Sequence, residues 1–269
     1  MRYSIFFLVL VIFISGCVEI EDQVHLLDMS MMADSETVFT GSKTTGYLDI
    51  NNNDVKSIKN VVMDIFETGY FTNVSECYKE GREIKPGSFD TLTCELEARS
   101  TIPRSPLITT VHGRVRFDTR LSAVQIIEMI TEDEYILRER TGELAKKPET
   151  YSYSDNNLEL QIDFSEELPV VVREGEEYRK KYMYLTIRNV GNGFVSNLEQ
   201  GGIEMRQEGD VVNEACIEQD LSIIGKEFPR IACEMDLPGE INYLSNYVII
   251  LDIDYNYELR EELSIEVIK

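Results

Sequence analysis

Four of the five cysteines form two pairs with identical spacing, and this regularity constrains the fold more than any other feature of the sequence. Cys77 and Cys94 lie 17 positions apart, and so do Cys216 and Cys233. Further landmarks repeat in the same order at offsets of 137 to 139 positions: residues 47–52 with 184–189, Val115, Phe117 and Leu121 with Ile253, Tyr255 and Leu259, and residues 127–130 with 265–268. Collinear agreement over this length indicates two copies of one domain.

The first seventeen residues predict export. Arg2 precedes an unbroken apolar run at 5–14, which is too short for a permanent membrane-spanning helix of about 20 residues but is typical of a signal peptide at 1–16. Residues 14–17, Ile-Ser-Gly-Cys, resemble the lipobox of prokaryotic lipoproteins. That resemblance implies cleavage before Cys17, a lipid on its sulfur and an acidic tether at 17–23. An ordinary signal peptide and an uncut N-terminal anchor are the alternatives.

In an exported protein, an even set of cysteines is typical of disulfides. The simplest of the three connectivities joins Cys77 to Cys94 and Cys216 to Cys233, and each bridge would stabilise the fold by about 3 kcal/mol. A four-cysteine metal site is the alternative. Structural zinc sites usually draw their ligands from C-x-x-C pairs, which this sequence lacks.

Alternating apolar and polar residues indicate β-strands, most clearly at 251–257, where Leu251, Ile253, Tyr255 and Tyr257 share one face. Turn residues recur every few positions along both copies. We therefore predict an all-β protein with two tandem immunoglobulin-like antiparallel β-sandwiches at 24–130 and 158–269. Because the cysteines of each pair are close in sequence, we expect each disulfide to join neighbouring strands or a loop, without crossing the core.

Two segments, 184–191 (Tyr-Leu-Thr-Ile-Arg-Asn-Val-Gly) and 253–257 (Ile-Asp-Tyr-Asn-Tyr), resemble the tandem Ig-like domains of archaeal and bacterial surface proteins, the group that includes the CARDB-like modules. The resemblance covers a small part of the chain. It implies a fold and a cell-surface location. It implies no chemistry, because such modules act mostly as spacers or binding surfaces.

One segment, 131–157, does not repeat. Thr131-Glu132-Asp133-Glu134 fits a capping box and Gly142 provides a stop, so we predict a short helix at 132–141, followed by a polar interdomain linker at 143–157. The helix would either dock a partner or cap the open end of the first sandwich. Capping is favoured because Tyr135 and Ile136 need burial.

No residue pattern indicates catalysis, so we predict a protein that is not an enzyme and has no cofactor. The two histidines, His25 and His112, match no ligand spacing, and the nucleophile-elbow, P-loop and dinucleotide-binding motifs are missing. Asp90-Thr91 and Asp118-Thr119 resemble the Asp-Thr of aspartic proteases but lack the glycine that must follow.

Two weaker sites remain. Four side chains of one turn could supply oxygen ligands to calcium: Asp49, Asn51, Asn53 and Asp54. Asp54 occupies the position of the EF-hand glycine, so an ordinary turn is favoured and no metal is predicted. Asn73 begins an Asn-Val-Ser sequon, a candidate for glycosylation.

The net charge of −23 excludes a nucleic acid partner, because this acidic excess repels phosphate. Asp252 and Asp254 share a strand face and could bind a cationic partner, but solvation is favoured. The sequence therefore predicts a non-catalytic protein, attached by its lipid to the outer, extracytoplasmic face of the cell membrane. It would act as a binding or spacer module for a protein or surface partner. The alternative is an accessory subunit of a membrane-associated secretion, pilus or transport complex.

Overall fold

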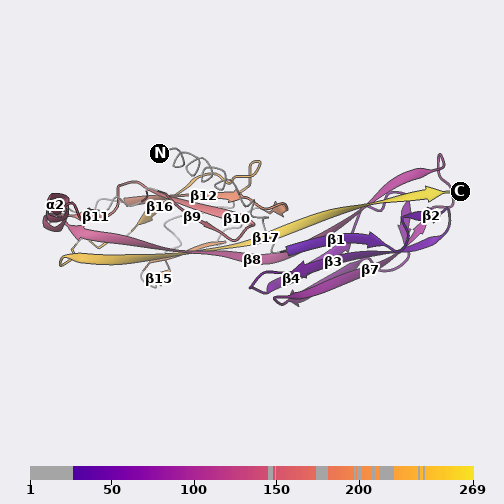
Figure 1. Cartoon of the computed structure of the whole chain (residues 1–269), viewed down its shortest axis with the longest axis horizontal. Coiled ribbons are helices and arrows are strands. Elements are labelled where there is room, and N and C mark those ends of the chain that lie inside the picture. The colour runs from indigo at the N-terminus through magenta and orange to yellow at the C-terminus, as the bar shows by residue number, and fades with distance from the viewer. Residues whose placement is uncertain are drawn as a thin grey trace, which may run out of the picture.

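Two 25-residue strands run through the molecule and pair with each other along their length. β8 (Leu107–Thr131) and β17 (Leu244–Ile268) form an antiparallel ribbon, in register from Leu107 opposite Val267 to Ile130 opposite Leu244. At about 3.4 Å per residue the ribbon is roughly 80 Å long. It connects the end that carries helix α2 with the end that carries the C-terminus (Figure 1).

The computed structural model describes residues 27–144, 148, 150–173, 181–196, 198, 202–207, 210–211, 221–235, 237–238 and 240–269. Within these residues the chain is mostly β-structure, as predicted, and the helix that the structure describes is α2 (Glu132–Thr141). No helix among them is long and apolar enough to cross a bilayer.

The first half of the molecule is built by the first copy and the C-terminal part of β17. The ribbon's sheet continues here through β4 (Ile58–Ile65), β6 (Tyr78–Ile84) and β2 (Thr37–Phe39), and the facing sheet has the order β1 (Leu27–Ala33), β3 (Lys43–Asn52), β7 (Ser88–Ala98), β5 (Phe71–Asn73). The sheets pack closely: a Cβ at Gly113 of β8 would lie 2.8 Å from Leu48 Cδ1 of β3. The glycine therefore permits the close contact.

The second half repeats this plan with the N-terminal part of β17 and the C-terminal part of β8. The ribbon's sheet continues through β14 (Ile203–Gln207), β15 (Asp210–Val211), β13 (Phe194–Val195) and β11 (Val170–Val172), and the facing sheet has the order β16 (Ile231–Met235), β12 (Lys181–Asn189), β10 (Leu158–Phe164), β9 (Thr150–Ser154). Tyr153 of β9 donates a hydrogen bond to Gln125 Oε1 of β8, 2.9 Å away, and so connects the two sheets.

The repeat and the strand pairing share one centre. Asp118 and Asn256 are 138 positions apart, which is the offset of the repeat, and they also lie opposite each other in the ribbon, with Asn256 Nδ2 donating to Asp118 Oδ1 over 2.9 Å. A half-turn about this pair therefore exchanges the two copies. β2 and β11 obey the same half-turn symmetry. Each of them pairs in parallel with the terminal strand of the other copy. The copies exchange the outer parts of their terminal strands.

This exchange corrects the predicted domain plan. Two separate sandwiches with a boundary at 130 are not seen, because β8 passes from the first half into the second. The segment 143–157, expected to be a linker, contains β9 at the edge of a sheet. The predicted helix at 132–141 is confirmed: Thr131 Oγ1 accepts a hydrogen bond from the Glu134 N–H over 3.4 Å, and Gly142, at φ 75°, ends it.

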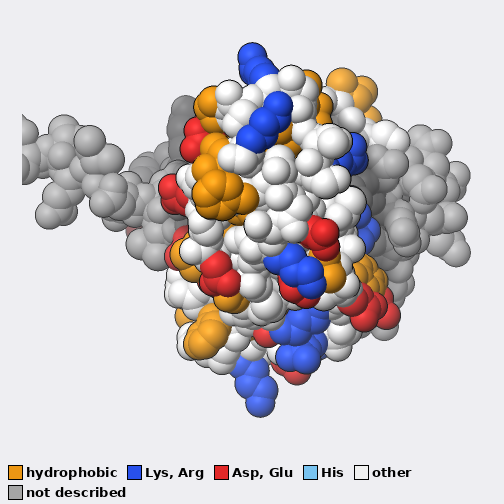
Figure 2. Space-filling view, turned by 90° about the vertical axis from the view of Figure 1, so that its right-hand side faces the viewer, with side chains coloured by type: hydrophobic (Ala, Val, Ile, Leu, Met, Phe, Trp, Pro, Cys, Tyr) orange, Lys and Arg blue, Asp and Glu red, His pale blue; other side chains and the backbone are white. Residues whose placement is uncertain are grey.

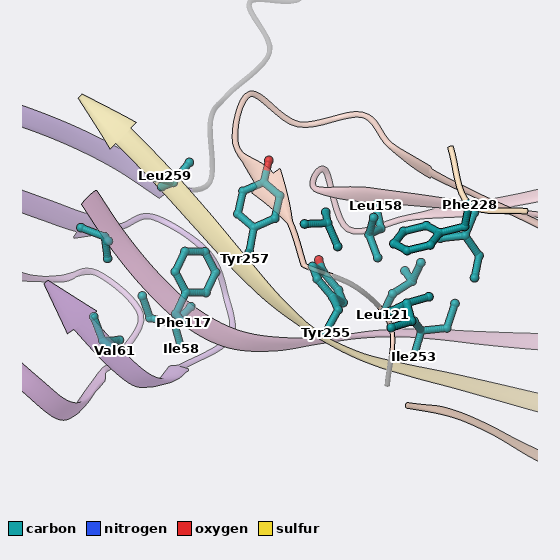
Figure 3. Packing of buried hydrophobic residues seen from close by; sticks show 14 of the residues in the cluster. Ile58, Val61, Phe117, Leu121, Leu158, Phe228, Ile253, Tyr255, Tyr257 and Leu259 are labelled. Carbon is teal, nitrogen blue, oxygen red and sulfur yellow. The ribbon is translucent and has the colours of Figure 1, made fainter. Parts of the chain in front are cut away.

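The hydrophobic core continues through the middle of the ribbon (Figure 3). Phe117 and Tyr257 are register partners, both fully buried, with ring centroids 5.8 Å apart. The Gly193 N–H donates to the Tyr257 hydroxyl over 2.7 Å, and a Cβ at Gly193 would lie 2.5 Å from the Glu258 carbonyl oxygen. Because side chains from both copies fill this junction, the two halves form one packed unit.

Equivalent buried asparagines end β3 and β12 and support the duplication. The Asn52 amide donates to the carbonyl oxygen of Lys56 over 2.9 Å, and the Asn189 amide donates to that of Gly193 over 2.8 Å. Each amide thus closes the turn four residues further on. Both strands end near the middle of the ribbon, where Lys59, the second residue of β4, lies opposite Asp118.

Candidate functional site

The outward face of the ribbon in the second half carries four aliphatic side chains, here called the aliphatic patch: Val124, Ile126, Val248 and Ile250. Val124 lies opposite Ile250, and Ile126 lies opposite Val248. Val124 and Ile126 are 52% and 53% exposed, and the other two are half-buried. Side chains opposite each other on one sheet face are in contact distance, so the four form one continuous surface.

Paired charges border the patch on the side toward the middle of the ribbon. Asp252 is only 4% exposed; it accepts a hydrogen bond from Ser122 Oγ over 2.5 Å and forms an ion pair with Arg206. Burial alone would raise the pKa of Asp252, but the hydrogen bonds from Ser122 and Arg206 outweigh it and hold that pKa below its usual value. Arg120 binds Asp254 through two hydrogen bonds of 2.6 Å each.

These contacts settle the expectation for the two aspartates. Asp252 and Asp254 do share one face of β17, as predicted, but Asp252 is buried and paired. The favoured interpretation of solvated carboxylates is therefore wrong for Asp252. Both carboxylates already have a guanidinium partner within the chain, so neither offers unpaired charge to a cationic partner.

On its other side the patch is bordered by helix α2. Arg138 of the helix forms ion pairs with Glu128 of β8 over 2.7 Å and with Glu134 over 2.5 Å. Tyr135 is half-buried, Ile136 is 36% exposed and Leu137 is 51% exposed. The helix follows β8 at the far end of the second half, so the prediction that it caps the first sandwich is wrong.

The equivalent positions of the first half are polar. His112 and Glu262 replace Ile250 and Val124 at the repeat offset, and Thr110 and Ser264 replace Val248 and Ile126. Nδ1 of His112 lies 3.4 Å from Glu262, and Nε2 lies 3.8 Å from Glu67. The histidine borders an open hollow of about 580 Å³, lined by Glu67, Thr68, Gly69, Tyr70, Ile108, Thr109, Thr110 and His112.

This histidine cluster brings together residues that the sequence analysis did not connect. Both glutamates are more than two-thirds exposed, at 73% and 70%. They lie on opposite ring nitrogens, so they cannot act on one proton or bind one ion together with the imidazole. Among the described residues, no group of three or more His, Cys, Asp or Glu side chains could hold a metal ion. The geometry is that of polar contacts at an exposed surface.

The structure confirms the disulfide Cys77–Cys94, with Cα atoms 4.9 Å apart. One expectation about it is wrong. The Cys77 carbonyl accepts from the Ile65 N–H in the ribbon's sheet, whereas Cys94 lies in β7 of the facing sheet, so the bridge connects the two sheets. A short spacing suffices because consecutive strands lie on opposite sheets. Cys233 is also disulfide-bonded. Its predicted partner Cys216 lies outside the described residues, as do Cys17 and His25.

The calcium and glycosylation candidates lie at the surface. Asp49 Oδ1 accepts a hydrogen bond from Thr91 over 2.6 Å, and Asn51 and Asn53 are bonded to each other over 3.0 Å. Asp54 Oδ1 accepts from the Val55 N–H over 2.6 Å. The Asp49 hydrogen bond joins the paired strands β3 and β7, and the other two are local to the end of β3 and the turn after it. Asn73 is exposed at the end of β5, and its modification stays a prediction.

The aliphatic patch was missed by the sequence analysis, although a signal for it exists. Residues 247–251, Tyr-Val-Ile-Ile-Leu, are apolar on both faces of a strand, which is typical of strands covered on both sides. By contrast, Figure 2 shows the end of the molecule that carries the C-terminus, where apolar side chains lie in separate groups among charges of both signs.

No model of a known protein family matches the chain, and no curated protein matches it.

Proposed function

We propose that this chain is a non-catalytic module on the outer face of a cell membrane, held there by a lipid on Cys17, and that it acts as a rigid binding or spacer element. The observation that carries the proposal is the uninterrupted ribbon with a core that crosses its middle. A rod of roughly 80 Å without a hinge holds a binding surface at a fixed distance from its attachment point. Its halves are Ig-like, CARDB-type sandwiches with exchanged terminal strands.

The place where the chain enters the fold fits an anchor. Leu27 lies opposite Asn52 at the end of β3, near the middle of the ribbon. The ten residues 17–26 span at most about 35 Å. A lipid on Cys17 would therefore hold the rod by its waist, close to the membrane, with both ends free. The net charge of −23 would keep the rod from lying flat on anionic headgroups.

The test is the variant Cys17→Ser in the producing cells, followed by membrane fractionation and intact-mass measurement. We expect the chain to leave the membrane fraction and to lose the mass of the lipid. Glu19→Gln, two residues further on, is the matched control and should stay in the membrane fraction. Unchanged fractionation together with an unchanged mature mass would remove the lipoprotein proposal, and retention of residues 1–16 would identify an uncut anchor.

A second candidate function is an accessory subunit of a larger membrane complex. The aliphatic patch favours it, because a free-standing spacer needs only scattered apolar side chains on its surface. Ile136 and Leu137 of α2 add exposed apolar side chains at the same end of the rod. A different protein captured reproducibly by the full chain, and lost with Ile126→Asp, would favour this candidate over the spacer.

A further inference from the structure

The aliphatic patch is not required by the fold. The half-turn about Asp118 and Asn256 places Thr110, His112, Glu262 and Ser264 in the same backbone positions of the first half, and that half forms the same sandwich with polar residues there. The outward apolar side chains of the second half therefore contribute nothing that its partner half needs. Exposed, contiguous aliphatic surface on one of two equivalent faces indicates an interaction site.

The charges around the patch select the partner. A chain with a net charge of −23 repels its own copies over most of its surface. The border of the patch carries both signs of charge, Arg120 beside Asp254 and Arg206 beside Asp252 and Glu204, so a second copy can place its arginines against these carboxylates.

We propose that the aliphatic patch binds the same patch on a second copy of this chain, in a two-fold symmetric contact. Two sheets that pack face to face keep their strands nearly aligned. With the two-fold axis along the strands, β8 of one copy faces β17 of the other. The register then places Val124 against the second copy's Ile250, Ile126 against its Val248, and Arg120 against its Asp254. Aliphatic groups meet aliphatic groups, and each arginine meets an aspartate.

The patch is small beside the roughly 800 Å² that each partner contributes to a standard interface. The contact is therefore weak in dilute solution and forms where anchoring concentrates the chains on one surface. In this respect the inference rests on the proposed function. It adds that the rods associate side by side through the aliphatic patches of their second halves.

The experiment is photo-crosslinking of the full chain in intact membranes. Val124 is replaced by p-benzoylphenylalanine, and the matched control carries the same residue at Ile108, which lies on the same face of the ribbon in the first half and is 71% exposed. We expect an adduct of about twice the mass of the mature chain from position 124 and at least tenfold less from position 108. Adding Ile126→Asp should reduce the adduct at least tenfold.

Thermal melting of Ile126→Asp, and of the milder Ile126→Ser, checks that the fold is kept. Sedimentation of the purified full chain over a concentration range gives a second measurement, in which only the unsubstituted chain should dimerise. An adduct with a different protein, an adduct with lipid alone, equal adducts from both positions, or a dimer that survives Ile126→Asp would each overturn the inference. Fractionation of Cys17→Ser reports location only, so a failed anchor and a failed dimer are distinguished.

Discussion

The two halves of the ribbon share one backbone and one inward face but differ on the outward face. Val115, Phe117 and Leu121 of the first copy match Ile253, Tyr255 and Leu259 of the second, and all six side chains are buried. Outward, His112 and Glu262 stand where the other half has Ile250 and Val124. The comparison teaches that burial goes with similar residues at the inward positions of the two halves, whereas the exposed outward positions differ. The outward face is therefore where the ribbon itself distinguishes the two halves.

The largest expected effect tests whether the halves form one unit. Phe117→Ala removes a fully buried ring at the junction and should lower the free energy of unfolding by about 3–5 kcal/mol. Because the core is continuous, calorimetry should show one transition that moves as a whole. Tyr255→Ala, the equivalent change in the other copy, should move the same transition. Phe89→Ala, at a side chain that is 75% exposed, is the control and should change little. Two transitions that respond separately would contradict the shared core.

The next effect concerns the disulfide of the first half. Replacing Cys77 and Cys94 together by Ser should lower the free energy of unfolding by about 2–4 kcal/mol, because the bridge restricts the unfolded chain and connects the two sheets. Urea unfolding with a spectroscopic probe in the second half should show the same loss. A second half that keeps its full stability would show that the ribbon does not couple the halves.

A smaller expected change in stability distinguishes two carboxylates on one face of β17. Asp252→Asn removes a buried, paired charge and should cost about 1–3 kcal/mol, whereas Asp254→Asn, whose ion pair is about half exposed, should cost less than about 1 kcal/mol. Urea unfolding of both variants against the unsubstituted chain gives the two values. Equal losses in the free energy of unfolding would mean that the greater burial of Asp252 does not make its ion pair more stabilising than that of Asp254.

The pH dependence of Asp252 has a defined sign. Its pKa is below the ordinary 3.8 in the folded state, so the folded protein favours the ionised form. The resulting stabilisation is complete at pH values above the ordinary pKa of the unfolded chain. It is lost as the pH falls through the lowered pKa of the folded protein. The stability difference between the unsubstituted chain and Asp252→Asn should therefore be constant near pH 6 and shrink below pH 4. A difference that grows on acidification would refute the lowered pKa.

The smallest effect sharpens the contrast between the outward faces. His112→Ile copies the residue of the second half into the first and should change the free energy of unfolding by less than about 0.5 kcal/mol, because the glutamates around His112 are exposed. Chemical denaturation measures it, with Ile250→His as the reciprocal variant. A large loss from His112→Ile would show that the histidine cluster supports the fold.

The sequence predicted local features well. The helix at 132–141 follows from a capping threonine and a terminal glycine, and the alternation at 251–257 follows from burial of one strand face. The disulfide Cys77–Cys94 follows from equal spacing in two copies. Each of these depends on residues that are close together in the chain.

The exchange of terminal strands could not be predicted in the same way, because a strand's alternation does not specify its neighbour. Its one sequence signal was length: inward apolar residues recur from Leu107 to Met129, far beyond an ordinary strand of five or six residues. The strand β9 was not predicted because the sequence Tyr-Ser-Tyr-Ser is typical of a polar linker. In the structure, Tyr151 and Tyr153 are half-buried. The aliphatic patch was missed because the pairing that assembles it joins positions from both copies.

The parallel pairing of β2 with the end of β17 also sets the order of events during synthesis. Thr37 lies opposite Glu266, 229 positions later in the chain, so the sheet of the first half lacks its inner strand until β17 has been made. Such distant pairing is slow to form. During synthesis, the first copy therefore cannot complete its sandwich before β17 emerges from the ribosome. For export of the kind proposed above, this delay would keep the first copy from closing until β17 has been made.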